Sequence, residues 1–175
     1  TYIKPEEVDI KPKTKDIAHG SNQVKIAVID TGIHESFYSI PGFMKTGCKK
    51  ADRNDVSGHG SVVSYLLYEE LIRNYNLLDV IPDFTIFNYN ATNENNELTL
   101  FNIMCSIAHA VRVNEVNVIN LSLGVYNNIP VLRYFLAKLT NEKPNIIFVA
   151  SAGNDAYNLN FVDHAPSMYH RNNDI

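Results

Sequence analysis

The sequence predicts an α/β fold in which a mostly parallel sheet is covered by helices on both faces. Short, β-branched apolar runs alternate along the chain with longer segments whose apolar residues recur every three or four positions. This alternation is typical of βαβ units with right-handed crossovers. The length of 175 residues is that of one domain, which can bury roughly 70% of the surface that its unfolded chain exposes.

Four apolar segments predict the strands of this sheet. The first, Val24–Ile29, runs directly into Asp30-Thr31-Gly32, so we expect a buried strand that ends in a turn. The other three are Phe84–Tyr89, Val118–Leu121 and Ile146–Val149. Because their apolar runs suit strands covered on both faces, we expect all four to be parallel neighbours in one sheet.

Three segments between these strands predict helices: Ser57–Asn76, Leu98–Val113 and Val131–Thr140. In the first, valines and leucines recur with the spacing of one helix face. In open parallel sheets, functional groups gather at the carboxyl ends of the strands. We therefore look for a site where the strands end.

Composition excludes several classes of function. The chain is 45% hydrophobic and 19% charged, and it has no apolar run near the roughly 20 residues that span a bilayer, so we expect no membrane span. The net charge is −4 without a basic stripe, which argues against a nucleic-acid partner. Cys48 and Cys105 are too few for a disulfide framework and lack a zinc-binding spacing.

Residues 1–20 are polar and contain two prolines, and we interpret them as an N-terminal extension to a domain over 21–175. They lack the pattern of a signal peptide. The compartment stays unknown: either the protein is cytoplasmic, or it is secreted after removal of a signal that this chain does not contain.

Four short motifs stand at strand ends or at a helix start. They are Asp30-Thr31-Gly32, Ser57-Gly58-His59-Gly60-Ser61, Ser122-Leu123-Gly124 and Ser151-Ala152-Gly153-Asn154. Taken in this order, they resemble the motifs of the subtilase family of serine peptidases, and the resemblance extends from about Val24 to the end of the chain. It implies a subtilisin-like fold and hydrolysis of peptide bonds.

The resemblance also implies a role for each motif. Asp30 would be the carboxylate that orients a histidine, and His59 would be the general base that takes a proton from a serine. The amide of Asn154 would stabilise the negative oxygen of the tetrahedral intermediate. Ser122, Leu123 and Gly124 would bind the substrate backbone. Ser151, Ala152 and Gly153 would wall the pocket for the residue before the scissile bond, with small side chains that leave room in it.

Each motif alone has a simpler interpretation. An Asp or a His at such a position usually caps a turn or helix, and Asn154 after a glycine is typical of a turn. His34, His109, His164 and His170 carry no motif, and we expect them to be surface or satisfied core side chains. Asp-Thr-Gly also occurs in aspartic peptidases, but a single copy in a helix-rich chain disfavours that class. No G-x-G-x-x-G follows the first strand, so a dinucleotide site is disfavoured too.

The family pattern is broken in two ways. Subtilases carry their serine in a later Gly-Thr-Ser segment, which this sequence lacks, so we expect the fold to be incomplete at its C-terminus. Within the matched region, Ser61 replaces the usual threonine, and the bulky Tyr65 stands where a small residue is usual. No run of carboxylates suggests an oxygen cage, and we expect no metal and no cofactor.

Three functions remain open. The chain is part of an active endopeptidase whose downstream segment carries the serine, and it is inactive alone; or it is an inactive, subtilase-like module that binds a peptide or protein; or it is a hydrolase with an in-chain nucleophile such as Ser61 or Ser151. The joint presence of Asp30, His59 and Asn154 favours the first, because a pure binding module does not need all three.

Overall fold

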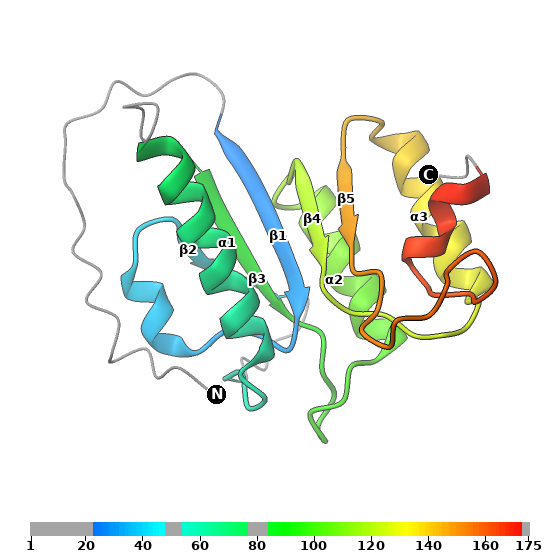
Figure 1. Ribbon diagram of the computed structural model, residues 1–175. Helices are drawn as coiled ribbons and strands as arrows, with labels where there is room; N and C mark the ends of the chain where they lie inside the picture. Colours follow the sequence, from blue (N-terminus) through cyan, green and yellow to red (C-terminus); the bar gives the residue numbers. More distant parts are fainter. Residues whose placement is uncertain (1–22, 48–53, 77–83, 173–175) are drawn as a thin grey trace.

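A five-stranded, fully parallel sheet forms the centre of the molecule in the computed structural model, which describes residues 23–47, 54–76 and 84–172 (Figure 1). The strands are β1 (Val24–Asp30), β2 (Phe43–Lys45), β3 (Phe84–Asn90), β4 (Val118–Leu121) and β5 (Ile147–Ala150). Their order in the sheet is β2-β3-β1-β4-β5. All four predicted strands are present as parallel neighbours, and the expected α/β class is confirmed.

Three helices cover the sheet on two faces (Figure 1). Helix α1 (His59–Asn76) packs on one face together with the short 3-10 helix η2 (Glu35–Ser39), whereas α2 (Leu100–Arg112) and α3 (Pro130–Glu142) pack on the other. A second 3-10 helix, η3 (Ser167–Asn172), closes the described part of the chain. The expected N-terminal extension, residues 1–20, lies outside the described residues.

Two apolar cores result, one on each face. Alternate residues of β1 divide between them: Ala27 and Ile29 face α2 and α3, whereas Val28 faces α1. The larger core includes Ile107 and Leu136, both almost fully buried. Because β1 is the middle strand and is covered on both faces, its last residue, Asp30, is held in a rigid and dry place.

The sequence analysis missed β2, a three-residue edge strand that pairs with β3. Phe43 at its start is buried in the core beneath α1, but a run of three residues carries too little alternation to be recognised. Helix α1 begins at His59, two residues later than expected, because the chain before it forms a hydrogen-bonded loop.

The part of the chain that the structure describes contains no helix that is long and apolar enough to cross a membrane.

Candidate active site

Asp30 is a buried carboxylate at the carboxyl end of β1, and its residue is 1% exposed. Its Oδ1 accepts a hydrogen bond from the backbone N–H of Thr31 at 2.7 Å and lies 3.2 Å from the hydroxyl oxygen of Thr31. Its Oδ2 is buried and has no hydrogen-bond partner among the described residues. A buried carboxylate with one oxygen unpartnered gains strongly from a nearby positive charge.

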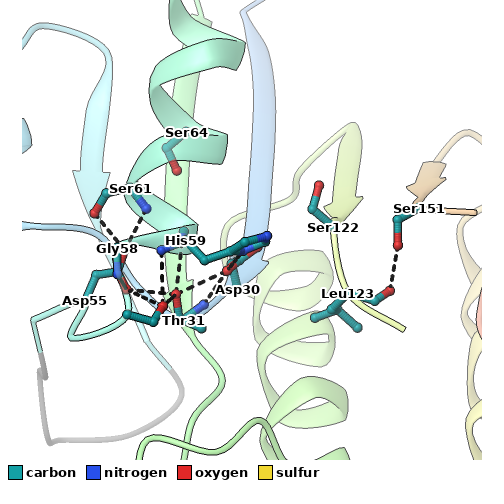
Figure 2. Close-up of polar contacts among 12 residues, drawn as sticks. Asp30, Thr31, Asp55, Gly58, His59, Ser61, Ser64, Ser122, Leu123 and Ser151 are labelled. Carbon is teal, nitrogen blue, oxygen red and sulfur yellow. Dashed lines mark hydrogen bonds and ion pairs between the residues drawn. The ribbon is translucent and has the colours of Figure 1, made fainter. Parts of the chain in front are cut away.

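His59 supplies the group that can carry this charge. It is the first residue of α1, and its ring Nδ1 lies 2.7 Å from Oδ1 of Asp30 (Figure 2). The contact lies within hydrogen-bond distance, about 3.2 Å or less between the two heavy atoms. The His59 side chain is 56% exposed, and its Nε2 is the ring nitrogen left to exchange a proton with a reacting group, because Nδ1 is engaged by Asp30.

A second carboxylate, Asp55, fixes the start of α1 (Figure 2). Its Oδ1 accepts from the Gly58 N–H at 2.9 Å and from the Thr31 hydroxyl at 2.8 Å. Its Oδ2 accepts from both the N–H and the hydroxyl of Ser61, each at 2.7 Å. Asp55 therefore ties the loop before His59 to the residue that follows Asp30. The sequence analysis missed it.

The Asp55 network also has an electrostatic consequence. Burial alone would raise the pKa of the Asp55 carboxyl, but the hydrogen bonds from Ser61, Thr31 and Gly58 outweigh it and hold the pKa below its ordinary value. Asp55 is therefore ionised in the folded protein at neutral pH. A negative charge at the N-terminus of α1 is also favoured by the helix dipole.

Gly60 allows α1 to approach β1 closely. A β-carbon on Gly60 would collide with the carbonyl oxygen of Gly32 and would lie 3.2 Å from Cβ of Asp30. The Gly60 N–H donates to the Thr31 hydroxyl at 3.0 Å. The absence of a side chain at this position brings His59 within reach of Asp30.

The two segments expected to bind substrate lie together at the ends of β4 and β5, beside the Asp30–His59 contact (Figure 2). The Ser151 N–H donates to the carbonyl of Leu121 at 3.1 Å, and the Ser151 hydroxyl donates to the carbonyl of Leu123 at 3.2 Å. Ser122 bonds to the Asn120 side chain at 2.9 Å. These contacts continue the β4–β5 pairing beyond the strands, so the segments form two adjacent walls.

The remaining residues of these motifs are open to solvent. Gly124, Ala152, Gly153 and Asn154 are all exposed. Asn154 lies in the turn that follows β5, in line with the position that the resemblance implies. Its role as an oxyanion donor stays a prediction.

The two departures from the family pattern, Ser61 and Tyr65, are accommodated by local contacts. The Ser61 hydroxyl replaces that of the usual threonine, is buried, and accepts from the His34 N–H at 2.9 Å. The bulky Tyr65 packs against Phe37 of η2, with ring centroids 6.4 Å apart. Tyr65 thus fills space between α1 and η2.

His34, His109 and His164 have hydrogen-bond partners elsewhere. His34 bonds to Ser36, and His109 lies 3.0 Å from the hydroxyl of Tyr89. His164 is buried, and its Nδ1 lies 2.8 Å from the hydroxyl of Ser167. Across residues 23–47, 54–76 and 84–172, no group of three or more His, Cys, Asp or Glu side chains could hold a metal ion.

Comparison with known proteins agrees with this arrangement. The family model described as "Subtilase family" matches residues 21–172. The chain belongs to the subtilase family. It is 28% identical over 150 residues to a thermophilic serine proteinase of Bacillus sp. (strain AK1), a match that covers 83% of this chain and 37% of the relative.

Solved structures of subtilases share the fold. A lanthipeptide protease, 26% identical, superposes with a TM-score of 0.62 over 82% of this chain and 45% of its own. A psychrophilic subtilisin-like protease from Pseudoalteromonas sp. AS-11, 18% identical, gives a TM-score of 0.55 over 75% of this chain and 31% of its own. This chain therefore spans less than half the length of each of these relatives.

Proposed function

We propose that this subtilase chain supplies the acid, the general base and the oxyanion donor of a serine endopeptidase, and that its nucleophile lies on a segment outside residues 1–175. The observation that carries the proposal is the 2.7 Å contact between buried Asp30 and the exposed side chain of His59. A carboxylate that fixes one ring nitrogen and leaves the other free is the arrangement that activates a serine.

In the proposed reaction, the serine Oγ attacks the carbonyl carbon of the scissile peptide while its proton passes to Nε2 of His59. Asp30 stabilises the imidazolium because it accepts from Nδ1–H. The proton then passes from Nε2 to the leaving amine, and the peptide C–N bond breaks to leave an acyl-enzyme. Water then attacks the acyl-enzyme in the same way, with His59 again as the base, and releases the carboxylic acid product.

The substrate-binding residues act on the peptide backbone and on the developing charge. Ser122, Leu123 and Gly124 offer backbone groups to an extended substrate strand. The Asn154 amide would donate a hydrogen bond to the oxyanion, an interaction that is worth most where water is excluded. Ser151, Ala152 and Gly153 form the second wall. Substrates are therefore peptides or proteins in an extended conformation.

The serines near the site support a nucleophile from elsewhere. The hydroxyl of Ser61 donates to Asp55 within the buried hydrogen-bond network at the start of α1. The hydroxyl of Ser151 donates to the carbonyl of Leu123. In both cases the hydroxyl proton is used in a structural hydrogen bond, whereas an activated nucleophile must give its proton to the base.

A fluorophosphonate probe, which reacts with activated serines, tests the proposal. We expect the 175-residue chain to stay unlabelled and a full-length protein that includes the serine-bearing segment to be labelled with one probe per molecule. His59→Ala should slow labelling of the full-length protein at least about a hundredfold, because the general base is lost. The matched control is His34→Ala, whose side chain bonds to Ser36 and should leave labelling unchanged.

Two outcomes would contradict the proposal. Labelling of the short chain that depends on His59 would place the nucleophile within it. A folded full-length protein that resists labelling but binds extended peptides would instead support the inactive, peptide-binding module.

A further inference from the structure

Two glycines at the substrate-binding walls lie close to aromatic side chains from more distant positions. A β-carbon on Gly124 would collide with the ring of His164, and one on Gly153 would collide with the hydroxyl oxygen of Tyr126. The β-carbon on Gly153 would also lie 3.3 Å from Cδ2 of His164. A side chain at Gly153 would therefore meet both rings, and one at Gly124 would meet that of His164. Tyr126 and His164, here called the aromatic pair, thus lie against both walls.

The aromatic pair is packed on both sides. The rings of Tyr126 and His164 have centroids 4.9 Å apart, and Tyr157 stands edge-on against Tyr126 at 5.0 Å with an interplanar angle of 87°. The Tyr126 hydroxyl accepts from the N–H of Asp155 at 3.3 Å. Edge-to-face aromatic packing and a hydrogen bond at the tip restrict the Tyr126 ring to one position.

His164 is anchored independently of Tyr126. Its Nδ1 lies 2.8 Å from the Ser167 hydroxyl, and the residue is 3% exposed. Its neighbour Ala165 pairs with Val125 through two backbone hydrogen bonds of 2.9 and 3.1 Å. The backbone that carries His164 is thereby fixed to the backbone that leads from Gly124 into Tyr126.

We infer that the aromatic pair makes this enzyme selective for a small residue, Gly, Ala or Ser, immediately before the scissile bond. The inference rests on the proposed function, because it uses the walls Ser122–Gly124 and Ser151–Gly153 as the substrate site. Ser151, Ala152 and Gly153 are small, as the sequence analysis noted, but rings from more distant positions lie against both walls. A large substrate side chain would have to displace packed aromatic groups.

The size of the selectivity follows from the packing. A single methylene changes kcat/KM by about 10-fold to 200-fold when a pocket discriminates by size. Phe exceeds Ala by a whole ring, so we expect at least about a tenfold preference for Ala over Phe even if the pocket relaxes in part.

The test compares fluorogenic peptides that differ only in the residue before the cleaved bond, with Gly, Ala, Leu or Phe there, on the full-length protein. We expect kcat/KM to be highest for Ala or Gly. Tyr126→Ala should open the space and reduce the preference for Ala over Phe at least about tenfold. Tyr126→Phe, which keeps the ring, should retain the preference, and so should the matched control Tyr134→Ala on the exposed side of α3.

Each outcome decides the inference. Wild-type cleavage after Phe as efficient as after Ala would overturn it, and so would an unchanged preference in a Tyr126→Ala protein whose melting temperature shows that it is folded. A protein that neither cleaves nor reacts with the fluorophosphonate probe would refute the proposed catalysis alone. The affinities of fluorescein-labelled peptides ending in Ala or Phe would then test the inferred selectivity, since binding needs no nucleophile. We expect the peptide ending in Ala to bind more tightly.

Discussion

Asp55 holds His59, the proposed general base, in place without touching it. It joins Thr31, next to the acid, to the backbone N–H groups of Gly58 and Ser61 on either side of His59. Asp55→Asn would replace one acceptor oxygen with an NH₂ group that cannot accept from these donors. We expect a loss of about 1.5–3 kcal/mol in the free energy of unfolding, the range for hydrogen bonds to a charged group, measurable by urea denaturation.

The same variant should change how stability depends on pH. Because the pKa of Asp55 is lower in the folded than in the unfolded protein, its ionised form contributes stability above the unfolded-state pKa of about 4. That contribution is lost as the pH falls through the folded-state pKa. The difference between wild type and Asp55→Asn should therefore shrink below about pH 4. A difference that stays constant on acidification would refute the charge-based explanation.

Individual residues differ in how far the sequence predicts them. Asp30 and His59 stand in local motifs, so their contact was foreseeable. Asp55 had a weaker signal, an Asp four residues before His59 at a helix start, where side-chain caps are common. Tyr126 and His164 lie 38 positions apart in the sequence and carry no motif, so their meeting depends on tertiary packing that no local pattern encodes.

The approach of α1 to β1 is set by Gly60. Gly60→Ala would force a methyl group against the Gly32 carbonyl, so the start of α1 must move away from the end of β1. We expect activity of the full-length protein to fall at least about a hundredfold as His59 separates from Asp30, with a stability loss of about 1–3 kcal/mol. Peptide hydrolysis and thermal unfolding measure both effects.

The matched control on the same helix is Arg73→Ala. Arg73 is solvent-exposed and pairs with Glu70 at 3.4 Å, and such surface pairs contribute little. It should leave activity and stability nearly unchanged. Normal activity of Gly60→Ala would show that the helix approach does not govern the Asp30–His59 contact.

Elements with a long or strongly periodic pattern were predicted well, and short ones were not. The strands around β1 and all three helices were foreseen, because burial on both faces gives continuous apolar runs. Boundaries were less certain: α3 begins at Pro130 and ends at Glu142, beyond the predicted Val131–Thr140 at both ends, because polar residues at the ends of a helix carry no periodicity.

The sheet as a whole is covered unevenly. On the face of the sheet that α1 covers in part (Figure 1), β5 exposes Ile147 and Val149, and α1 itself exposes Val62 and Leu66. The other face of β5 packs against the core formed with α2 and α3. An apolar sheet face open to water is unfavourable unless something covers it. We propose that the segment that carries the serine packs there, because this face lies beside the helix that presents His59.

Val149→Lys tests this arrangement in the full-length protein. Val149 is 48% exposed in this chain, so a lysine there would be harmless if the face stayed open, within about 0.5 kcal/mol. If the serine-bearing segment covers the face, the lysine becomes a buried, unpaired charge. The free energy of unfolding should then fall by at least about 3 kcal/mol, with loss of fluorophosphonate labelling. Val113→Lys is the matched control, since Val113 is 64% exposed at the end of α2 on the opposite face. Equal stability of the two variants would mean that the nucleophile segment packs elsewhere.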